Sequence, residues 1–458
     1  MSDFSVAGRR VVVVGGGRSG VAAAELAAAR GASVTLTDLK DRLPDEARLR
    51  SAGVALALGG HPPDLLAGAD LVVLSPGVAW GQPCLDGARA AHVPVIGEIE
   101  LAWRFLRGRV VAVTGTKGKS TTTTLIGRML RAAGVKMTAG GNLGQALSAQ
   151  VAESTPHTIH VVEVSSFQLE GIETFHPWIA VLLNVSADHL DRHATFDEYV
   201  RAKGRVFANQ DQDDWAVVNA DDPEAVALAR RSRARQRRFS LETPLEDGIV
   251  ISGGRIVDRT AGGETPLIPL SAIRLLGRHL VGDVMAAAAV SRLAGATPEA
   301  MTQAVASFAG LEHTLEPVAE IGGVRFVNDT KATNIEAARR SIESFNHGVV
   351  PIMGGRYKGG DFRDLRDLVT QRVTAIIAIG ESRRLVKDAL GDLVPVREAV
   401  SMRDAVRAAM AAAPQGGTVV LAPACSSFDM FADYAERGRA FKEEVAALAA
   451  EERRGREQ

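Results

Sequence analysis

A β-branched run that ends in a glycine- and lysine-containing loop constrains this chain more than any other stretch. The run VVAV is followed by TGTKGKST at residues 114–121 and then by a helix-forming run, LIGRML. Strand, loop and helix in this order predict a phosphate-binding loop, because loop amides and the positive end of a helix dipole attract a polyphosphate. We expect Lys119 to reach the outer phosphates and the Ser120 hydroxyl to hold Mg2+. Val113 stands where the full P-loop motif has its first glycine, so the loop is a shorter variant. The alternative is an ordinary turn with a surface lysine.

The composition predicts an ordinary globular chain of several domains. The 458 residues are 46% hydrophobic and 23% charged, and a usual size of ~150 residues predicts about three domains. The net charge of −1 gives no reason to expect a nucleic acid partner. No apolar run approaches the ~20 residues needed to span a bilayer, and the first residues do not read as a signal peptide. We therefore expect a cytoplasmic chain with no membrane insertion. We also expect it to be a monomer, although these observations do not bear on the oligomeric state.

The cysteines exclude two further classes. The sequence contains only Cys84 and Cys425, which are too few and too far apart for a disulfide framework or a zinc ribbon.

A βαβ unit with a glycine-rich turn opens the first segment, residues 1–99. An apolar strand is followed by GGGRSG at residues 15–20, an alanine-rich helix and a strand that ends in Asp38. A G-x-G-x-x-G turn with an acid about 20 residues later is typical of dinucleotide binding. Asp38 then binds a ribose hydroxyl, or else simply begins a turn. Ser75 follows another apolar strand, at the edge where open α/β sheets bind ligands.

Polar residues also end the strands of the central segment, residues 100–311. Glu163 ends the apolar run IHVVE, where an acid beside a phosphate-binding strand commonly contacts the nucleotide's Mg2+. The next strand leads to His189 and His193, which have the i, i+4 spacing of zinc enzymes but lack the glutamate of the H-E-x-x-H motif. Three interpretations stay open: zinc ligands, a structural pair, and one histidine at a magnesium–phosphate site. Lys203, by pattern alone, is a helix-surface lysine.

The last segment, residues 312–458, is again α/β and carries three polar clusters at strand ends. They read NDTKATN, GGRYKGG and PACSSFD. Three such clusters in one small domain predict a ligand site rather than three decorated turns. Cys425 has no neighbouring basic pair, so we interpret it as a small apolar turn residue.

Taken together, these runs resemble those of the Mur ligases over nearly the whole length. The matching runs are GTKGKST (115–121), GGNLG (140–144), EVSSFQL (163–169), NVSADHLDRH (184–193), AKGRVF (202–207), NDTKATN (328–334), GGRYKGGDF (354–362) and APACSSFDMF (422–431). The resemblance implies three α/β domains: a Rossmann-like domain for the UDP part of the substrate (1–99), a P-loop ATP-binding domain (100–311) and a Rossmann-like amino-acid domain (312–458). It further implies an ATP-dependent ligase that joins D-glutamate to UDP-N-acetylmuramoyl-L-alanine through an acyl phosphate, in peptidoglycan precursor synthesis.

The resemblance also implies roles for particular residues. Catalysis falls to Lys119, Glu163, His189 and Lys203, and two Mg2+ sites to Ser120, Glu163, His189 and Lys203, with Lys203 carbamylated by CO2 so that it can act as a ligand. ATP is assigned to Gly115, Thr116, Lys117, Gly118, Lys119, Ser120, Thr121, Asp283, Asp329 and Lys331. The UDP part is assigned to Ser19, Asp38 and Ser75, and the acyl and D-glutamate parts to Asn142, Thr333, Lys358, Ser427, Phe428 and Tyr434.

Two departures from the family pattern concern the nucleotide. The family's G-x-H-N-x-x-N run has Leu280 and Asp283 in place of its two asparagines, although Asp283 retains an acceptor for the adenine amino group. The family's G-L-x-H-R run ends here in Thr314. Neither departure touches the expected metal ligands.

Three alternatives remain at this stage. A sister ligase for another amino acid, including L-glutamate, has much the same residues. A nicotinamide-dependent oxidoreductase accounts for the first βαβ unit but leaves the P-loop, Glu163 and His189 without a role. The third alternative is a nucleotide-binding module without catalysis.

Overall fold

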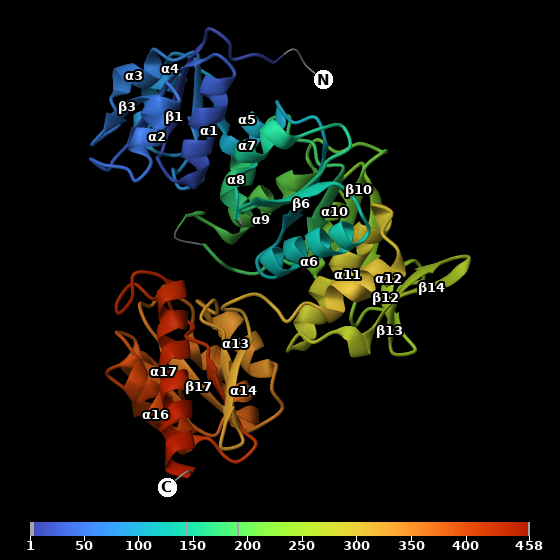
Figure 1. Ribbon diagram of the computed structural model, residues 1–458, viewed down its shortest axis with the longest axis vertical. Coiled ribbons are helices and arrows are strands. Elements are labelled where there is room, and N and C mark those ends of the chain that lie inside the picture. Colours follow the sequence, from blue (N-terminus) through green and yellow to red (C-terminus); the bar gives the residue numbers. More distant parts are fainter. Residues whose placement is uncertain (1–3, 143, 190–191, 457–458) are drawn as a thin grey trace. The chain divides into compact units, whose positions relative to one another are not determined.

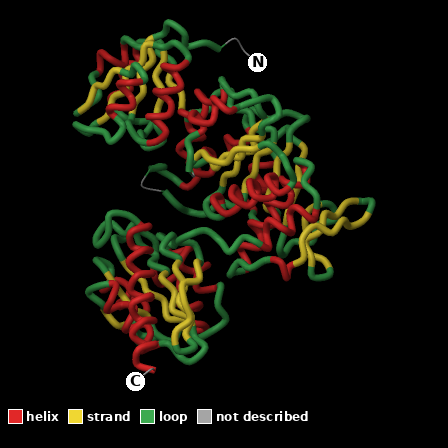
Figure 2. Tube along the Cα trace, in the orientation of Figure 1, coloured by secondary structure: helices red, strands yellow, loops and turns green. Residues whose placement is uncertain are grey.

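The computed structural model describes residues 4–142, 144–189 and 192–456 and contains three β-sheets, each flanked by helices (Figure 1; Figure 2). Leu143, Leu190 and Asp191, which belong to two of the runs above, lie outside the described residues. The chain divides into two compact units, residues 1–272 with 282–305, and residues 273–281 with 306–458. The α/β class with three sheets is confirmed. The domain boundaries at 99/100 and 311/312 stay predictions.

The first sheet of unit 1 is five-stranded and entirely parallel, in the order β3-β2-β1-β4-β5. Its strands are β1 (Arg10–Val14), β2 (Ser33–Asp38), β3 (Ala55–Leu58), β4 (Leu71–Leu74) and β5 (Val95–Gly97), and its helices are α1 (Arg18–Ala29), α2 (Glu46–Ser51), α3 (Pro63–Ala67), α4 (Asp86–Ala90) and α5 (Glu98–Trp103), with the 3-10 turn η1 (Pro83–Leu85). The central strand β1 is buried from Val11 to Val14, as expected for a parallel strand covered on both faces.

The second sheet of unit 1 has nine strands in the order β14-β13-β12-β11-β10-β9-β6-β8-β7, and only the β12–β13–β14 end is antiparallel. The strands are β6 (Arg109–Thr114), β7 (Met137–Gly141), β8 (Ile159–Glu163), β9 (Ile179–Leu182), β10 (Trp215–Asn219), β11 (Arg235–Phe239), β12 (Gly248–Ser252), β13 (Arg255–Thr260) and β14 (Gly263–Pro269). The helices are α6 (Lys119–Ala132), α7 (Leu147–Gln150), α8 (Ser166–Glu170), α9 (Phe196–Gly204), α10 (Pro223–Ala229), α11 (Arg278–Leu293) and α12 (Pro298–Ala306), with η2 (Val151–Glu153), η3 (Arg205–Phe207) and η4 (Leu270–Ala272). The first residues of α11, up to 281, belong to unit 2.

This topology gathers the polar strand ends of the central segment. Strands β8, β6 and β9 are parallel neighbours, so their carboxyl ends share one edge of the sheet. The phosphate-binding loop follows β6, Glu163 ends β8, and Asn184 follows β9. Capping side chains fix two of the nearby helices: Ser165 and Gln168 form a reciprocal capping box at α8, and Thr195 accepts from the Glu198 amide at α9.

Unit 2 contains a six-stranded sheet in the order β15-β16-β20-β17-β18-β19, parallel except for β15. The strands are β15 (Glu316–Ile321), β16 (Val324–Asn328), β17 (Val349–Gly354), β18 (Ile376–Ile379), β19 (Val396–Glu398) and β20 (Thr418–Leu421), and the helices are α13 (Ile335–Glu343), α14 (Arg366–Arg372), α15 (Arg383–Leu390), α16 (Met402–Ala412) and α17 (Tyr434–Arg456), with η5 (Phe362–Leu365). Alternate residues of β17 enter two apolar cores, one containing Val349 and one containing Val350, so both faces of the sheet are covered.

No helix in the described part of the chain is both long enough and apolar enough to cross a bilayer.

Candidate active site

The phosphate-binding loop has the conformation that its glycines predict. It connects β6 to α6, and Gly115 and Gly118 have φ angles of 152° and 86°, where glycine is favoured. A Cβ on Gly118 would lie 2.2 Å from Asp283 Oδ1, so the loop also needs glycine there for space. The Nζ atom of Lys119 donates to the carbonyl oxygens of Gly115 and Thr116 at 3.0 and 2.9 Å. The Lys119 side chain therefore folds back over the phosphate-binding loop, where it was predicted to contact the outer phosphates.

Three of the predicted site residues meet around the carboxylate of Glu163. The Ser120 hydroxyl donates to Oε2 at 2.7 Å, and the Asn142 side-chain amide donates to Oε1 at 2.7 Å. Glu163 itself is buried at the end of β8. A hydroxyl and a carboxylate at hydrogen-bonding distance are the hard oxygen donors that Mg2+ prefers beside a phosphate. The donor set therefore fits a magnesium ion.

Lys203 is buried, so the interpretation of this residue as a helix-surface lysine is wrong. Its side chain is 2% exposed, and Nζ donates to the Gly115 carbonyl oxygen at 2.7 Å and lies 4.6 Å from the centre of the Tyr199 ring. Burial and the nearby charge of Lys119 hold the pKa of Lys203 well below its usual value. The helix period does not reveal this burial, because the lysine sits where α9 meets the phosphate-binding loop.

His189 and His193 both lie beside Tyr199 but differ in their surroundings. The ring of His189 is 5.0 Å from that of Phe167 and 6.5 Å from that of Tyr199, on a backbone with φ of 55°. His193 is buried and its Nε2 forms a 3.0 Å hydrogen bond with the Ser166 hydroxyl, which supports a structural role for this histidine. Burial lowers the pKa of His193, so its imidazole is neutral at physiological pH.

The structure adds residues that the sequence analysis did not assign. Lys117 forms an ion pair with Asp188 at 3.2 Å, and its backbone amide donates to Asn184 Oδ1 at 2.9 Å. Thr116 Oγ1 lies 3.0 Å from the Tyr199 hydroxyl. Asn184 and Asp188 follow β9, so their position after an apolar strand was the available signal. For Tyr199 no comparable signal exists.

The residues predicted for the UDP part gather at the carboxyl edge of the first sheet. Asp38 accepts from the backbone amides of Gly16 and Lys40 at 2.6 and 2.8 Å, so its carboxylate holds the glycine-rich turn in place. Ser75 packs against Gly15, whose Cβ would lie 2.9 Å from that of the serine. Ser19 lies half-buried in the first turn of α1. The turn-forming role considered for Asp38 is therefore present.

The residues predicted for D-glutamate lie in unit 2, on or next to the loops that follow β16, β20 and β17, together with Asp329 and Lys331, which were predicted for ATP. These strands are neighbours in the sheet, so the three loops share one edge. Asp329 is buried and Oδ1 accepts from the Leu315 amide, whereas Phe428 is 62% exposed. Ser427 is buried, Thr333 is half-buried, Lys358 and Tyr434 are exposed, and Lys331 Nζ lies 5.9 Å from the Tyr434 ring centre.

The two departures from the family pattern fall in different units. Asp283 is buried against Gly118 in unit 1. Leu280 lies in the apolar core of unit 2 together with Ile335 and Phe345. An adenine contact at Asp283 stays a prediction.

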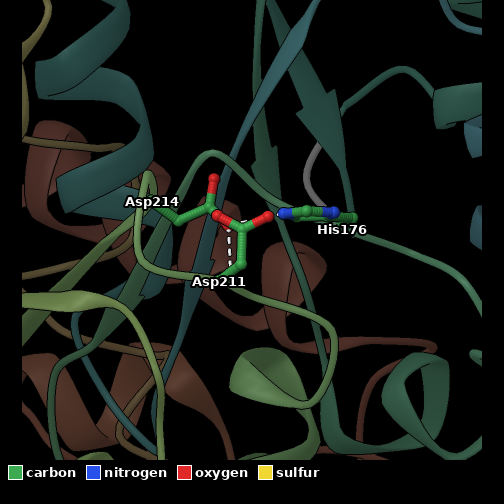
Figure 3. Close-up of side chains that lie close together, drawn as sticks. All are labelled: His176, Asp211 and Asp214. Atoms are coloured by element: carbon green, nitrogen blue, oxygen red, sulfur yellow. Dashed lines mark hydrogen bonds and ion pairs between the residues drawn. The ribbon is translucent and has the colours of Figure 1, made fainter.

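Among the described residues, one group of three potential metal ligands has its donor atoms within 4.8 Å of one another: His176, Asp211 and Asp214 (Figure 3). Asp214 Oδ2 accepts from His176 Nε2 at 2.5 Å and from the Asp211 amide at 2.8 Å. The group precedes β9 and β10, at the amino edge of the sheet, whereas the phosphate-binding loop is at the carboxyl edge. Its hydrogen bonds close the turn before β10.

Three family models match the chain in the order of its sheets: the Mur ligase MurD-like N-terminal domain (residues 9–97), the Mur ligase middle domain (113–291) and the Mur ligase glutamate ligase domain (315–425). Among solved structures, a pseudomurein peptide ligase type C from Methanothermus fervidus has a TM-score of 0.62 at 16% identity and covers 96% of this chain and 100% of its own. A MurF ligase from Thermotoga maritima has a TM-score of 0.61 at 18% identity, with 97% and 96% covered. These structures share the fold.

Relatives at higher identity narrow the class. A UDP-N-acetylmuramoylalanine--D-glutamate ligase of Acidobacterium capsulatum is 45% identical over 445 residues, which cover 96% of each chain. One of Geotalea daltonii is 44% identical over 449 residues, covering 97% of this chain and 99% of its own. The chain belongs to the Mur ligase family. Within that family its relatives place it among the UDP-N-acetylmuramoylalanine--D-glutamate ligases. The first βαβ unit is therefore part of a Mur ligase N-terminal domain, and the oxidoreductase alternative is set aside.

Proposed function

We propose that this chain joins D-glutamate to UDP-N-acetylmuramoyl-L-alanine with ATP, forming an amide and releasing ADP and phosphate. The names of its relatives state a ligase of UDP-N-acetylmuramoylalanine and D-glutamate. We assign the reaction to the synthesis of a peptidoglycan precursor. The observation that carries the proposal is the convergence of Lys119, Ser120, Glu163 and Lys203 around one glycine-rich loop. This arrangement suits a polyphosphate and the transfer of its terminal phosphoryl group.

The first step activates a carboxylate, which is a poor acyl donor. An oxygen of the L-alanine carboxylate forms a bond to the γ-phosphorus of ATP while the bond from that phosphorus to the β,γ-bridging oxygen breaks. The loop amides and the Lys119 ammonium hold the phosphates and offset the charge that gathers on them. We assign further ATP contacts to Thr116, Lys117, Thr121, Asp283, Asp329 and Lys331.

In the second step the amine of D-glutamate attacks the acyl carbon, and phosphate leaves as the carbon–oxygen bond of the tetrahedral intermediate breaks. Asn142 donates its side-chain amide to Glu163, which supports its assignment to the acyl phosphate or to the Mg2+ site. Binding of D-glutamate is assigned to Lys358, Thr333 and Ser427, with Phe428 and Tyr434 as the site wall. The substrate's UDP part is assigned to Ser19, Asp38 and Ser75.

Two magnesium ions complete the proposal. Ser120 and Glu163 would hold one, and His189 and Lys203 would hold the second. Bound Mg2+ offsets the negative charge of the phosphates and fixes their geometry.

An ammonium cannot be a ligand, so we propose that CO2 carbamylates Lys203. The Nζ atom adds to the carbon of CO2 and loses a proton, which turns a positive side chain into an anionic oxygen donor. The burial of this lysine and its lowered pKa favour the neutral amine that the addition needs.

The assignment is tested by measuring phosphate release from ATP with UDP-N-acetylmuramoyl-L-alanine and one amino acid at a time. We expect release that depends on D-glutamate and is at least tenfold slower with L-glutamate, L-alanine or a diamino acid. Release that is independent of the amino acid contradicts a ligase, and release that follows another amino acid assigns a sister activity. We also expect a monomer, because one chain supplies every assigned residue; light scattering of the active enzyme checks this.

A further inference from the structure

A buried arginine, Arg437, connects the loops to which the proposed function assigns D-glutamate. It lies in the first turn of α17 and is 1% exposed, the largest fully buried side chain among the described residues. Arg437 is not among the residues assigned above to ATP, Mg2+ or the substrates. Among the described residues, Asp429 interacts electrostatically with its guanidinium but does not form an ion pair with it.

All of the hydrogen bonds recorded for the guanidinium go to two strand-end loops. Nε donates to Thr330 Oγ1 at 2.9 Å and Nη2 donates to the Thr330 carbonyl oxygen at 3.0 Å, on the loop after β16. Nη1 donates to the Cys425 carbonyl oxygen at 3.1 Å, on the loop after β20. The planar fork of arginine therefore sets the spacing of the two loops, which a flexible lysine does less well.

The third strand-end loop packs against the same group. A Cβ on Gly355, after β17, would lie 3.3 Å from Arg437 Nη1 and 3.1 Å from Cys425 Cβ, so the loop approaches the guanidinium closely. Gly438, which follows Arg437 in α17, is also close to these loops, because a Cβ on it would lie 2.7 Å from Thr330 Cγ2. The start of α17 thus fits between the loops with little room for adjustment.

The neighbours of the contacted residues are the ones assigned to substrate. Thr330 is three residues before Thr333 and Cys425 is two residues before Ser427, and both Thr333 and Ser427 are assigned to D-glutamate. Burial lowers the pKa of Arg437 to about 10, which leaves the side chain cationic at neutral pH. Asp429, on the loop after β20, offsets part of this charge, but no carboxylate forms an ion pair with the guanidinium within the described residues. The buried cation therefore adds positive potential beneath these loops, which favours an anionic amino acid.

We propose that Arg437 is a positioning residue for the amino-acid site: it sets the geometry of the Thr330 and Cys425 loops and adds buried positive charge that favours a substrate with a second carboxylate. The inference rests on the proposed function, because it takes the D-glutamate site to lie on these loops. Arg437 does not touch the reacting atoms in this account and acts through the loops that do.

The test compares Arg437→Met and Arg437→Lys with Arg439→Met, an exposed arginine two residues along the same helix. Wild-type enzyme is assayed first; if its phosphate release does not depend on D-glutamate, the proposed function fails, whatever the variants do. If phosphate release by the wild type does depend on D-glutamate, we expect Arg437→Met to raise the KM for D-glutamate at least tenfold. The KM for UDP-N-acetylmuramoyl-L-alanine is expected to rise less than twofold. Arg437→Lys retains the positive charge but not the planar guanidinium. Its KM for D-glutamate is therefore expected to lie between that of wild type and that of Arg437→Met. Arg439→Met is expected to match wild type.

A purely structural role gives a different result. In that case the variants lower kcat in proportion to the folded fraction, measured by thermal unfolding, and leave the KM for D-glutamate unchanged; this outcome overturns the proposal, as does an equal rise in both KM values. If Arg437→Met does not fold, Arg437→Lys and Thr330→Val decide, since the valine removes the hydroxyl that accepts from Nε. We expect each to raise the KM for D-glutamate at least threefold. A wild-type KM in both overturns the proposal.

Discussion

The Nζ atom of Lys203 donates a 2.7 Å hydrogen bond to the carbonyl oxygen of Gly115, the glycine that opens the phosphate-binding loop. Residues 88 positions apart in the sequence thereby share one carbonyl, which Lys119 also contacts. Two lysines on one carbonyl oxygen disfavour two positive charges, and the lowered pKa of Lys203 has this cause in addition to burial. A lysine in this setting is suited to lose its proton and react.

Replacing Lys203 with alanine should lower turnover by about 100-fold or more. The reason is that the substitution removes the proposed anionic Mg2+ ligand from a site where negative charge develops. Added formate or acetate should restore part of the rate by supplying the missing carboxylate. Steady-state phosphate release with and without the acids measures both effects. Lys136→Ala, at an exposed lysine, is the control and should retain the wild-type rate. Full activity of the unrescued Lys203 variant removes this residue from the site.

Glu163→Gln keeps the shape of the side chain and removes its charge. We expect kcat/KM to fall by about 10²–10³-fold, because a neutral amide neither offsets Mg2+ nor accepts from both Ser120 and Asn142 as the carboxylate does. The Mg2+ concentration for half-maximal rate should rise, which a magnesium titration measures. Glu153→Gln is the matched change at an exposed position. An unchanged magnesium requirement in Glu163→Gln contradicts the assignment.

Arg192 links the histidine-containing segment to the loop after β4. Its Nη2 donates to the Val78 carbonyl oxygen at 2.8 Å, and its guanidinium carbon lies 4.6 Å from the Phe167 ring centre. Because the Val78 loop begins at Ser75, Arg192→Gln should raise the KM for UDP-N-acetylmuramoyl-L-alanine by about tenfold, the value of one charge-assisted hydrogen bond. The KM for D-glutamate should stay within twofold. The control is Arg201→Gln, at an exposed arginine of α9. Initial rates of both variants give the KM for UDP-N-acetylmuramoyl-L-alanine, and equal values in the two variants contradict the prediction.

His160 makes the stability of unit 1 depend on pH. The ring is buried, its Nδ1 and Nε2 lie 2.9 and 2.8 Å from the hydroxyls of Thr138 and Ser154, and burial lowers its pKa to about 4 from 6.5. Between these values the unfolded chain binds the proton and the folded chain does not, so the free energy of unfolding falls as the pH drops from about 6.5 toward 4. The full effect is about 3 kcal/mol.

Urea unfolding midpoints from pH 7 to pH 4.5 measure this dependence. His160→Gln keeps hydrogen-bonding capacity without a titrating group, so its midpoint should fall less over this range than that of wild type. Some dependence should remain, because burial also lowers the pKa of His193, which lies in unit 1 as well. His157→Gln, at an exposed histidine, should follow wild type. Parallel curves for His160→Gln and wild type show that His160 is not the group responsible.

Local patterns predicted the fold and the loop more fully than the side-chain surroundings. Strand β2 ends at Asp38 and strand β8 at Glu163, as expected, since apolar runs and the polar residues that end them are local signals. The contact of Ser120 with Glu163 was implied because parallel neighbouring strands bring their carboxyl ends together. Neither the burial of Lys203 nor that of Arg437 has such a signal. Each depends on which loop a helix meets in three dimensions, and a helix period does not encode that partner.

Leu280 stands where the family pattern has an asparagine, so Leu280→Asn restores the family residue. Leu280 is 4% exposed and packs in the core of unit 2, and a buried amide there would lose apolar contacts and lack assured hydrogen-bond partners. We expect the free energy of unfolding to fall by about 2–4 kcal/mol, with the KM for ATP within twofold of wild type. Thermal unfolding and ATP titrations, with the exposed Leu385→Asn as control, measure both quantities. If Leu280→Asn instead lowers the KM for ATP and leaves the stability unchanged, the side chain at position 280 contacts the nucleotide. In that case the leucine has removed an adenine contact and does not stabilise the core.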